Sequence, residues 1–144
     1  MIPSENQARW SAVLALQQAA HRVVHILSAQ LAEFGMTASE INAMANLAAH
    51  PGSTVSELAA AAGIRSTTMT SVLDRLEKRG LVLRGPAIGD RRAVRIEMTD
   101  QGRAAAGAID AAIDALERRA LADLPAEAMS GLQAALERFA EGAA

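Results

Sequence analysis

The segment Gly63–Gly80 constrains the fold more than any other part of this chain. Its apolar residues recur at the i, i+3, i+4 and i+7 positions that share one side of a helix, namely Met69, Val72, Leu73 and Leu76. Ser66 is expected to cap the helix, and Gly80 stands where a left-handed residue ends one. The segment therefore predicts a short helix with one buried side and one polar, exposed side.

The neighbouring segments predict what this helix belongs to. Thr54-Val-Ser-Glu57 has the spacing of a capping box and opens a helix over 55–62. Gly63 separates this helix from the next one. Residues 81–84 and 93–98 predict two strands, joined by a loop over 85–92, and Ser53-Thr54 could add a short strand. Helix, turn, helix and hairpin together predict a winged helix-turn-helix.

The charge of this region differs from that of the whole chain. The protein is acidic, with 14 Lys and Arg against 16 Asp and Glu, whereas residues 63–95 hold eight basic and three acidic side chains, a net of +5. The remainder therefore carries −7. A basic island on an acidic protein is suited to DNA, because neutralised phosphates release counterions and the acidic remainder limits indiscriminate adhesion. A solvated basic surface without a partner is the alternative.

Helices are predicted on both sides of this region. They are expected over 4–33, over 37–50 where Thr37-Ala-Ser-Glu40 has the spacing of a second capping box, over 99–123 and over 126–140. A first helix of about 30 residues is too long to be covered by its own domain, so part of its apolar surface is expected to meet a second subunit. We predict one mainly α domain over 1–144, with a winged helix-turn-helix lobe over 37–102, a small β-hairpin wing, and a helical dimerisation region from 1–36 and 103–144.

Several classes of function lack the residues that they need. The chain has no cysteine, which excludes disulfides, thiolate metal sites and sensing by thiol oxidation. It has no Gly-rich phosphate loop, no nucleophile elbow and no His and carboxylate at a catalytic spacing, so we expect neither an enzyme nor a cofactor. Without a leader or an apolar run of about 18 residues, it is expected to be soluble, cytoplasmic and free of membrane partners.

Three stretches resemble the MarR family of bacterial transcriptional regulators, named for multiple antibiotic resistance. They are residues 58–63, 70–82 and 90–102, and the combination of Asp-Arg-Arg at 90–92 with Thr-Asp-Gln-Gly at 99–102 is specific. The resemblance implies a homodimer that places two recognition helices in successive major grooves of a pseudo-palindromic DNA duplex. It also implies a repressor that a small phenolic, aromatic or lipophilic ligand releases from DNA.

Residues of the predicted recognition helix and wing are the candidates for DNA contact. Short hydroxyl side chains suit base edges or phosphates, and arginines suit phosphates or guanine. The resemblance places Asp90 and Arg92 in the Asp-x-Arg pattern of the wing, in which the arginine enters the minor groove and the aspartate helps to hold the wing. For Asp74 and Arg75, an intrahelical or interhelical ion pair that shapes the helix is as good an interpretation as DNA contact. The predicted set is Arg65, Ser66, Thr67, Thr68, Thr70, Ser71, Arg75, Arg84, Asp90, Arg91 and Arg92.

Five residues on the first two helices are candidates for the wall of an effector cleft: Trp10, His21, Arg22, His25 and Met44. A protonated histidine or Arg22 could meet a carboxylate. The alternative is that Trp10 belongs to a dimer core and the histidines are ordinary helix residues. His21 and His25 also have the i, i+4 spacing of two zinc ligands, but no further ligand follows from the sequence, so no metal site is predicted. The rival functions are a winged-helix dimer that binds a protein, or a metal-responsive regulator.

Overall fold

The computed structural model describes residues 9–87 and 90–142, and the side chains of 87–93 lie outside this description. The elements in chain order are α1 (Ala12–Gln30), a 3-10 helix (Ala32–Phe34), α2 (Ala38–Ala49), α3 (Val55–Ala62), α4 (Ser66–Lys78), β1 (Val82–Ala87), β2 (Asp90–Met98), α5 (Asp100–Leu121) and α6 (Ala126–Ala140). The predicted fold class, mainly α with a β-hairpin, is confirmed. The chain forms two compact units, which divide between Ala112 and Ile113.

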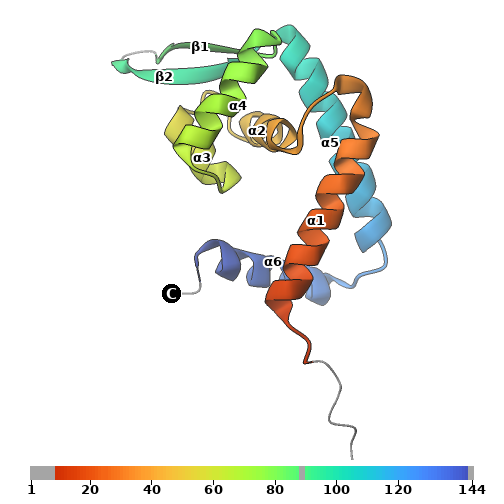
Figure 1. The fold of residues 1–144 in the computed structure, drawn as a ribbon. Helices are drawn as coiled ribbons and strands as arrows, with labels where there is room; N and C mark the ends of the chain where they lie inside the picture. The colour runs from red at the N-terminus through yellow and green to blue at the C-terminus, as the bar shows by residue number, and fades with distance from the viewer. Residues whose placement is uncertain (1–8, 88–89, 143–144) are drawn as a thin grey trace, which may run out of the picture. The chain divides into compact units, whose positions relative to one another are not determined.

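The core of the first unit lies where α2, α3 and α4 meet the base of the hairpin (Figure 1). All four apolar residues of the predicted α4 stripe are buried, each with an exposure of 1% or less. Leu47 of α2, Leu58 of α3 and Ile96 of β2 are buried as well. The helical period of the sequence therefore identified the side of α4 that faces the core, and consequently the side that faces outward.

The caps of α3 and α4 differ from one another. In α3, the Glu57 amide donates to Thr54 Oγ1 over 3.2 Å and the Thr54 amide donates to Glu57 Oε2 over 3.3 Å, which confirms the capping box. In α4, Ser66 is the first helical residue and Arg65 is the N-cap, without a side-chain cap. The prediction that Ser66 caps α4 is therefore wrong. Within the helix, the backbone carbonyl of Ser66 accepts a hydrogen bond from the Thr70 hydroxyl.

The strands of the wing are longer than predicted. β1 and β2 pair antiparallel from Val82 opposite Met98 to Pro86 opposite Val94, so the loop predicted over 85–92 is wrong at both of its ends. Pro86 lies in a strand that pairs on one side only and directly before a shift in the register, positions at which strands tolerate proline. The predicted extra strand is confirmed as a single bridge between Thr54 and Arg95, where the Ile96 amide donates to the Ser53 carbonyl over 2.9 Å.

The first helix is shorter than predicted. The prediction of one helix over 4–33 is wrong, because α1 spans 19 residues from Ala12 to Gln30. The Ser11 side chain accepts from the Leu14 amide and so begins the helix there, while the chain leaves it through the 3-10 turn and Gly35 at φ 61°. Residues 4–8 lie outside the described part. No residue of α1 is buried, and Val13, Leu14, Val23 and Val24 are exposed.

α5 begins in the first unit, where Thr99 Oγ1 accepts from the Gly102 amide over 3.0 Å. Its buried residues there are small or β-branched: Gly102, Ala105, Ala106 and Ile109. The second unit, from Ile113 onward, contains the end of α5 and the whole of α6. No residue of α6 is buried, although Met129, Leu132, Leu136 and Phe139 share one side of it. Among residues 9–87 and 90–142, no helix is long and apolar enough to cross a membrane.

Candidate nucleic-acid interface

The first part of α4 presents a row of exposed hydroxyl groups, which we call the hydroxyl surface: Ser66, Thr67, Thr68, Thr70 and Ser71. Two of these groups make local hydrogen bonds, from Thr70 Oγ1 to the Ser66 carbonyl over 2.9 Å and from Ser71 Oγ to the Thr67 carbonyl over 3.4 Å. A hydroxyl that donates to its own helix still has lone pairs with which to accept. The hydroxyl surface can therefore donate to or accept from an external ligand without a large rearrangement.

One flank of α4 is joined to α2 by a buried carboxylate. Glu40 has a side-chain exposure of only 4%, and its Oε1 lies 3.1 Å from Arg75 Nε while its Oε2 lies 2.9 Å from Arg79 Nη1. Arg79 also donates to the carbonyls of Phe34 and Gly35. Glu40 was predicted to complete a capping box with Thr37, but only the Thr37 half of that box forms, because the Glu40 carboxylate turns toward the two arginines.

The other flank of α4 is joined to the wing by Arg84. Its Nη2 forms an ion pair with Asp74 and lies 3.4 Å from the Thr70 carbonyl oxygen. Its Nε lies 3.1 Å from Glu77 Oε2, although without the direction of a hydrogen bond. Asp74 therefore pairs with the wing, and Arg75 forms with α2 the interhelical ion pair that was the alternative to DNA contact. Arg84, which was predicted as a DNA contact, occupies a position that fixes the hairpin against α4.

Two exposed basic residues, at the two ends of α4, stand apart from these pairs. Arg65 and Lys78 are exposed, and neither makes an ion pair within the part of the chain whose side chains the structure describes. The predicted wing residues Asp90, Arg91 and Arg92 lie at the start of β2, near the hairpin tip, but their side chains are outside the described set. Their roles in DNA contact stay predictions.

The structure places the predicted effector residues in different surroundings. Met44 is fully buried in the lobe core, whereas Trp10 precedes α1 and is 78% exposed. His21 and His25 lie side by side on α1 with their Nε2 atoms 3.1 Å apart and their rings edge to face, and Arg22 is exposed beside them. Within the described residues, no group of three or more His, Cys, Asp or Glu side chains is placed to hold a metal ion.

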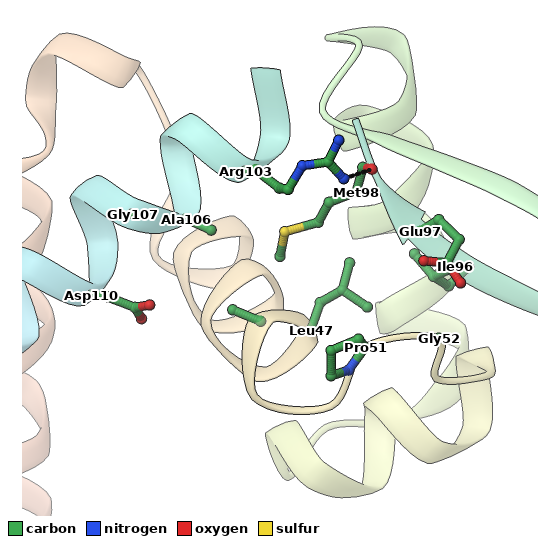
Figure 2. A pocket seen from close by; sticks show the side chains of 11 residues that line it. Leu47, Pro51, Gly52, Ile96, Glu97, Met98, Arg103, Ala106, Gly107 and Asp110 are labelled. Atoms are coloured by element: carbon green, nitrogen blue, oxygen red, sulfur yellow. Dashed lines mark hydrogen bonds between the residues drawn. The ribbon is translucent and has the colours of Figure 1, made fainter. Parts of the chain in front are cut away.

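A cavity of about 400 Å³ lies elsewhere in the first unit, between the end of α2, β2 and the start of α5. Figure 2 shows apolar side chains such as Leu47 and Met98 inside it and charged ones at its edge, where Arg103 Nη1 donates to the Met98 carbonyl over 3.1 Å. No local pattern in the sequence marks this cavity, because it combines segments that lie more than 40 residues apart. Its lining is Leu47, Ala48, Pro51, Gly52, Ile96, Glu97, Met98, Arg103, Ala106, Gly107 and Asp110.

A three-helix lobe with an exposed polar helix and a two-stranded wing defines a winged helix-turn-helix protein. A family model described as MarR family matches residues 34–93. The homoprotocatechuate degradative operon repressor of Escherichia coli is 30% identical over 129 residues, which cover 90% of this chain and 87% of that protein. An HTH-type transcriptional repressor of Mycobacterium tuberculosis is 32% identical over 113 residues, 78% of this chain and 81% of that one. The chain therefore belongs to the MarR family of transcriptional regulators.

The structural comparison agrees on the fold. The crystal structure of CouR from Rhodococcus jostii RHA1 bound to p-coumaroyl-CoA superposes with a TM-score of 0.80 at 24% identity, over 88% of this chain and 89% of that one. Because the family consists of transcriptional regulators, the predictions of a DNA-binding regulator and of a protein that is not an enzyme are confirmed.

Proposed function

We propose that this protein is a dimeric repressor that binds a pseudo-palindromic operator in the cytoplasm and leaves it when a small aromatic or lipophilic ligand binds. The observation that carries the DNA-binding part is the hydroxyl surface of α4, which is exposed along its whole length. Family membership supports the regulatory part, because the two curated relatives described above are repressors.

The proposed DNA contacts follow from which groups are exposed. The hydroxyl surface enters the major groove, where short side chains accept from and donate to base edges and nearby phosphates. Arg65, directly before α4, and Lys78, near its end, reach phosphates on either side. Arg92 at the wing enters the adjacent minor groove. The ion pairs of Arg75 and Arg84 favour a supporting role for these two residues.

The dimer is proposed from two helices, one in each compact unit, that expose apolar side chains. α1 and α6 contain no buried residue, yet each exposes several large apolar side chains. Such surfaces are costly to leave in water, and contact with a second copy would bury them. We therefore assign dimerisation to the helices outside the winged lobe, in the regions 1–36 and 103–144.

The effector is proposed to act near the junction of β2 and α5. The cavity there has an apolar interior and charged groups at its edge, which suits a small amphiphilic molecule. One relative is the repressor of a homoprotocatechuate degradative operon, and the similar CouR structure contains p-coumaroyl-CoA, so aromatic acids are the first compounds to test. Trp10, His21, Arg22, His25 and Met44 stay predictions for an effector site.

Fluorescence anisotropy with DNA from the region upstream of the protein's own gene tests this function. We expect tighter binding to that fragment than to random duplex of equal length, and an affinity that falls steeply as salt rises. Phenolic acids added to the preformed complex should release the DNA. Equal, weak binding to both duplexes would contradict the proposed function and favour a winged-helix dimer that binds a protein.

A further inference from the structure

We propose that Glu40 is a specificity-determining residue that withholds Arg75 from the DNA backbone. The inference rests on the proposed function, because it concerns how the recognition helix α4 tells its operator from other DNA. Glu40 is a buried acid that neither the hydroxyl surface nor the wing requires. Glu40 lies on α2, and among the described residues its carboxylate forms ion pairs with Arg75 of α4 and with Arg79, the C-cap of α4.

Burial makes this carboxylate an effective partner for the two arginines. An ionised group with only 4% of its side chain exposed has few water contacts, so its hydrogen bonds to guanidinium groups replace its hydration. The Glu40 oxygens are shared, one to Arg75 and one to Arg79. The two arginines lie one helical turn apart, and the single acid holds both on the flank of α4 that faces α2.

The two arginines depend on Glu40 to different degrees. Arg79 has two further acceptors in the carbonyl oxygens of Phe34 and Gly35, so it stays anchored if Glu40 is neutralised. Arg75 makes its one described hydrogen bond to Glu40, and its side chain is 49% exposed. Loss of the Glu40 charge would therefore release Arg75 selectively.

A released Arg75 would reach DNA phosphates. It lies one helical turn after Ser71, beside the hydroxyl surface, and an extended arginine bonds phosphate of any sequence. Each added phosphate contact steepens the salt dependence of binding and raises the affinity for every duplex. By holding the side chain of Arg75 against α2, Glu40 leaves recognition to the hydroxyl surface and keeps binding to random DNA weak.

Glu40→Gln tests this inference, since it keeps the shape of the side chain and removes its charge. We expect the slope of log K against log salt for random duplex to steepen by about 0.9, the value for one phosphate. The affinity for random duplex should rise on the order of tenfold at 0.1 M salt, and the preference for the upstream fragment should fall. Glu33→Gln is the matched control, because it removes the same charge from an exposed position in the 3-10 helix of the same unit.

Double variants identify the arginine involved. In the Glu40→Gln background, Arg75→Gln should restore the original slope, whereas Arg79→Gln should leave the steeper slope in place. Arg75→Gln alone should change the slope for random duplex little, and a decrease of about 0.9 would overturn the proposal by showing that Arg75 already contacts phosphate.

The measurement separates a folding defect and a failed function from a failed inference. A lower melting temperature of Glu40→Gln with an unchanged slope would assign Glu40 to stability alone and overturn the proposal. If Glu40→Gln does not fold, the slope of log K against log salt for Arg75→Gln on random duplex still tests whether Arg75 contacts phosphate in the original protein. Equal binding of the original protein to upstream and random DNA would count against the proposed function. The slope of log K against log salt on random duplex would still test the role of Glu40.

Discussion

Single residues fix the joint where α4, the wing and α5 meet. The Thr99 hydroxyl donates to the Gly80 carbonyl over 2.6 Å and accepts from the Gly102 amide, while the Thr99 amide donates to the Leu81 carbonyl over 3.1 Å. The backbone passes so close at this joint that a Cβ on Gly102 would overlap the Leu81 carbonyl oxygen. The glycine of the Thr-Asp-Gln-Gly motif is therefore required by the approach of two backbones and not by its own dihedral angles.

Gly102→Ala should consequently destabilise the fold. The added methyl group meets backbone, which cannot rotate away, so we expect a loss of about 1–3 kcal/mol in the free energy of unfolding. Urea denaturation followed by circular dichroism measures it. Gly107→Ala on the same helix is the control, because nothing lies within 4 Å of its added Cβ, and it should be neutral or slightly stabilising. Equal stability of the two variants would contradict the overlap.

At the scale of elements, α4 is held on both flanks while its outward side stays clear. Arg84 connects it to β1, and Glu40 connects it to α2. Exposed ion pairs contribute roughly 0–1 kcal/mol each, so the pairs of Arg84 are better understood as setting the direction of the wing than as a source of stability. The wing then projects from a defined base, beside the helix that is proposed to contact DNA.

The tip of the wing should therefore contribute to DNA binding separately from α4. We expect Arg92→Ala to weaken binding to the upstream fragment by about 1–3 kcal/mol and to leave the oligomeric state unchanged. Fluorescence anisotropy gives the affinity and size-exclusion chromatography with light scattering gives the mass. Arg118→Ala, which removes an equal charge from the last turn of α5, should bind as the original protein does. An unchanged affinity of Arg92→Ala would remove the wing from the proposed interface.

At the scale of the whole molecule, the exposed apolar sides of α1 and α6 are the surfaces assigned to the proposed dimer. Leu132 and Leu136 are 39% and 42% exposed on α6, at the spacing of one helical side. A regulator that reads two half-sites needs a second copy in any case, since each protomer carries one recognition helix.

Leu132→Glu with Leu136→Glu should convert the proposed dimer into a monomer, because two carboxylates cannot be buried without partners. Sedimentation velocity measures the change, and binding to the upstream fragment should weaken by more than about tenfold once one half-site is lost. Ala134→Glu, on the opposite side of α6, should remain dimeric. A dimer that persists in the double variant would place the interface elsewhere.

The sequence alone determined the parts whose cause is local. The period of Met69, Val72, Leu73 and Leu76 gave α4 its buried side, because a helix repeats over a few residues. The hydroxyl surface followed as the remaining side, and it is exposed as predicted. The capping box of Thr54 and Glu57 formed for the same reason, since its two partners lie within one turn.

Only the tertiary structure decided what depends on distant segments. Glu40 reaches Arg75 across 35 positions of the chain, Arg84 reaches back to α4, and the cavity beside Leu47 needs three separate elements. Charged side chains show the same local pattern whether they meet DNA, water or each other. Their partners are set by how helices pack, and that packing depends on the summed burial of the whole lobe rather than on any one stretch of sequence.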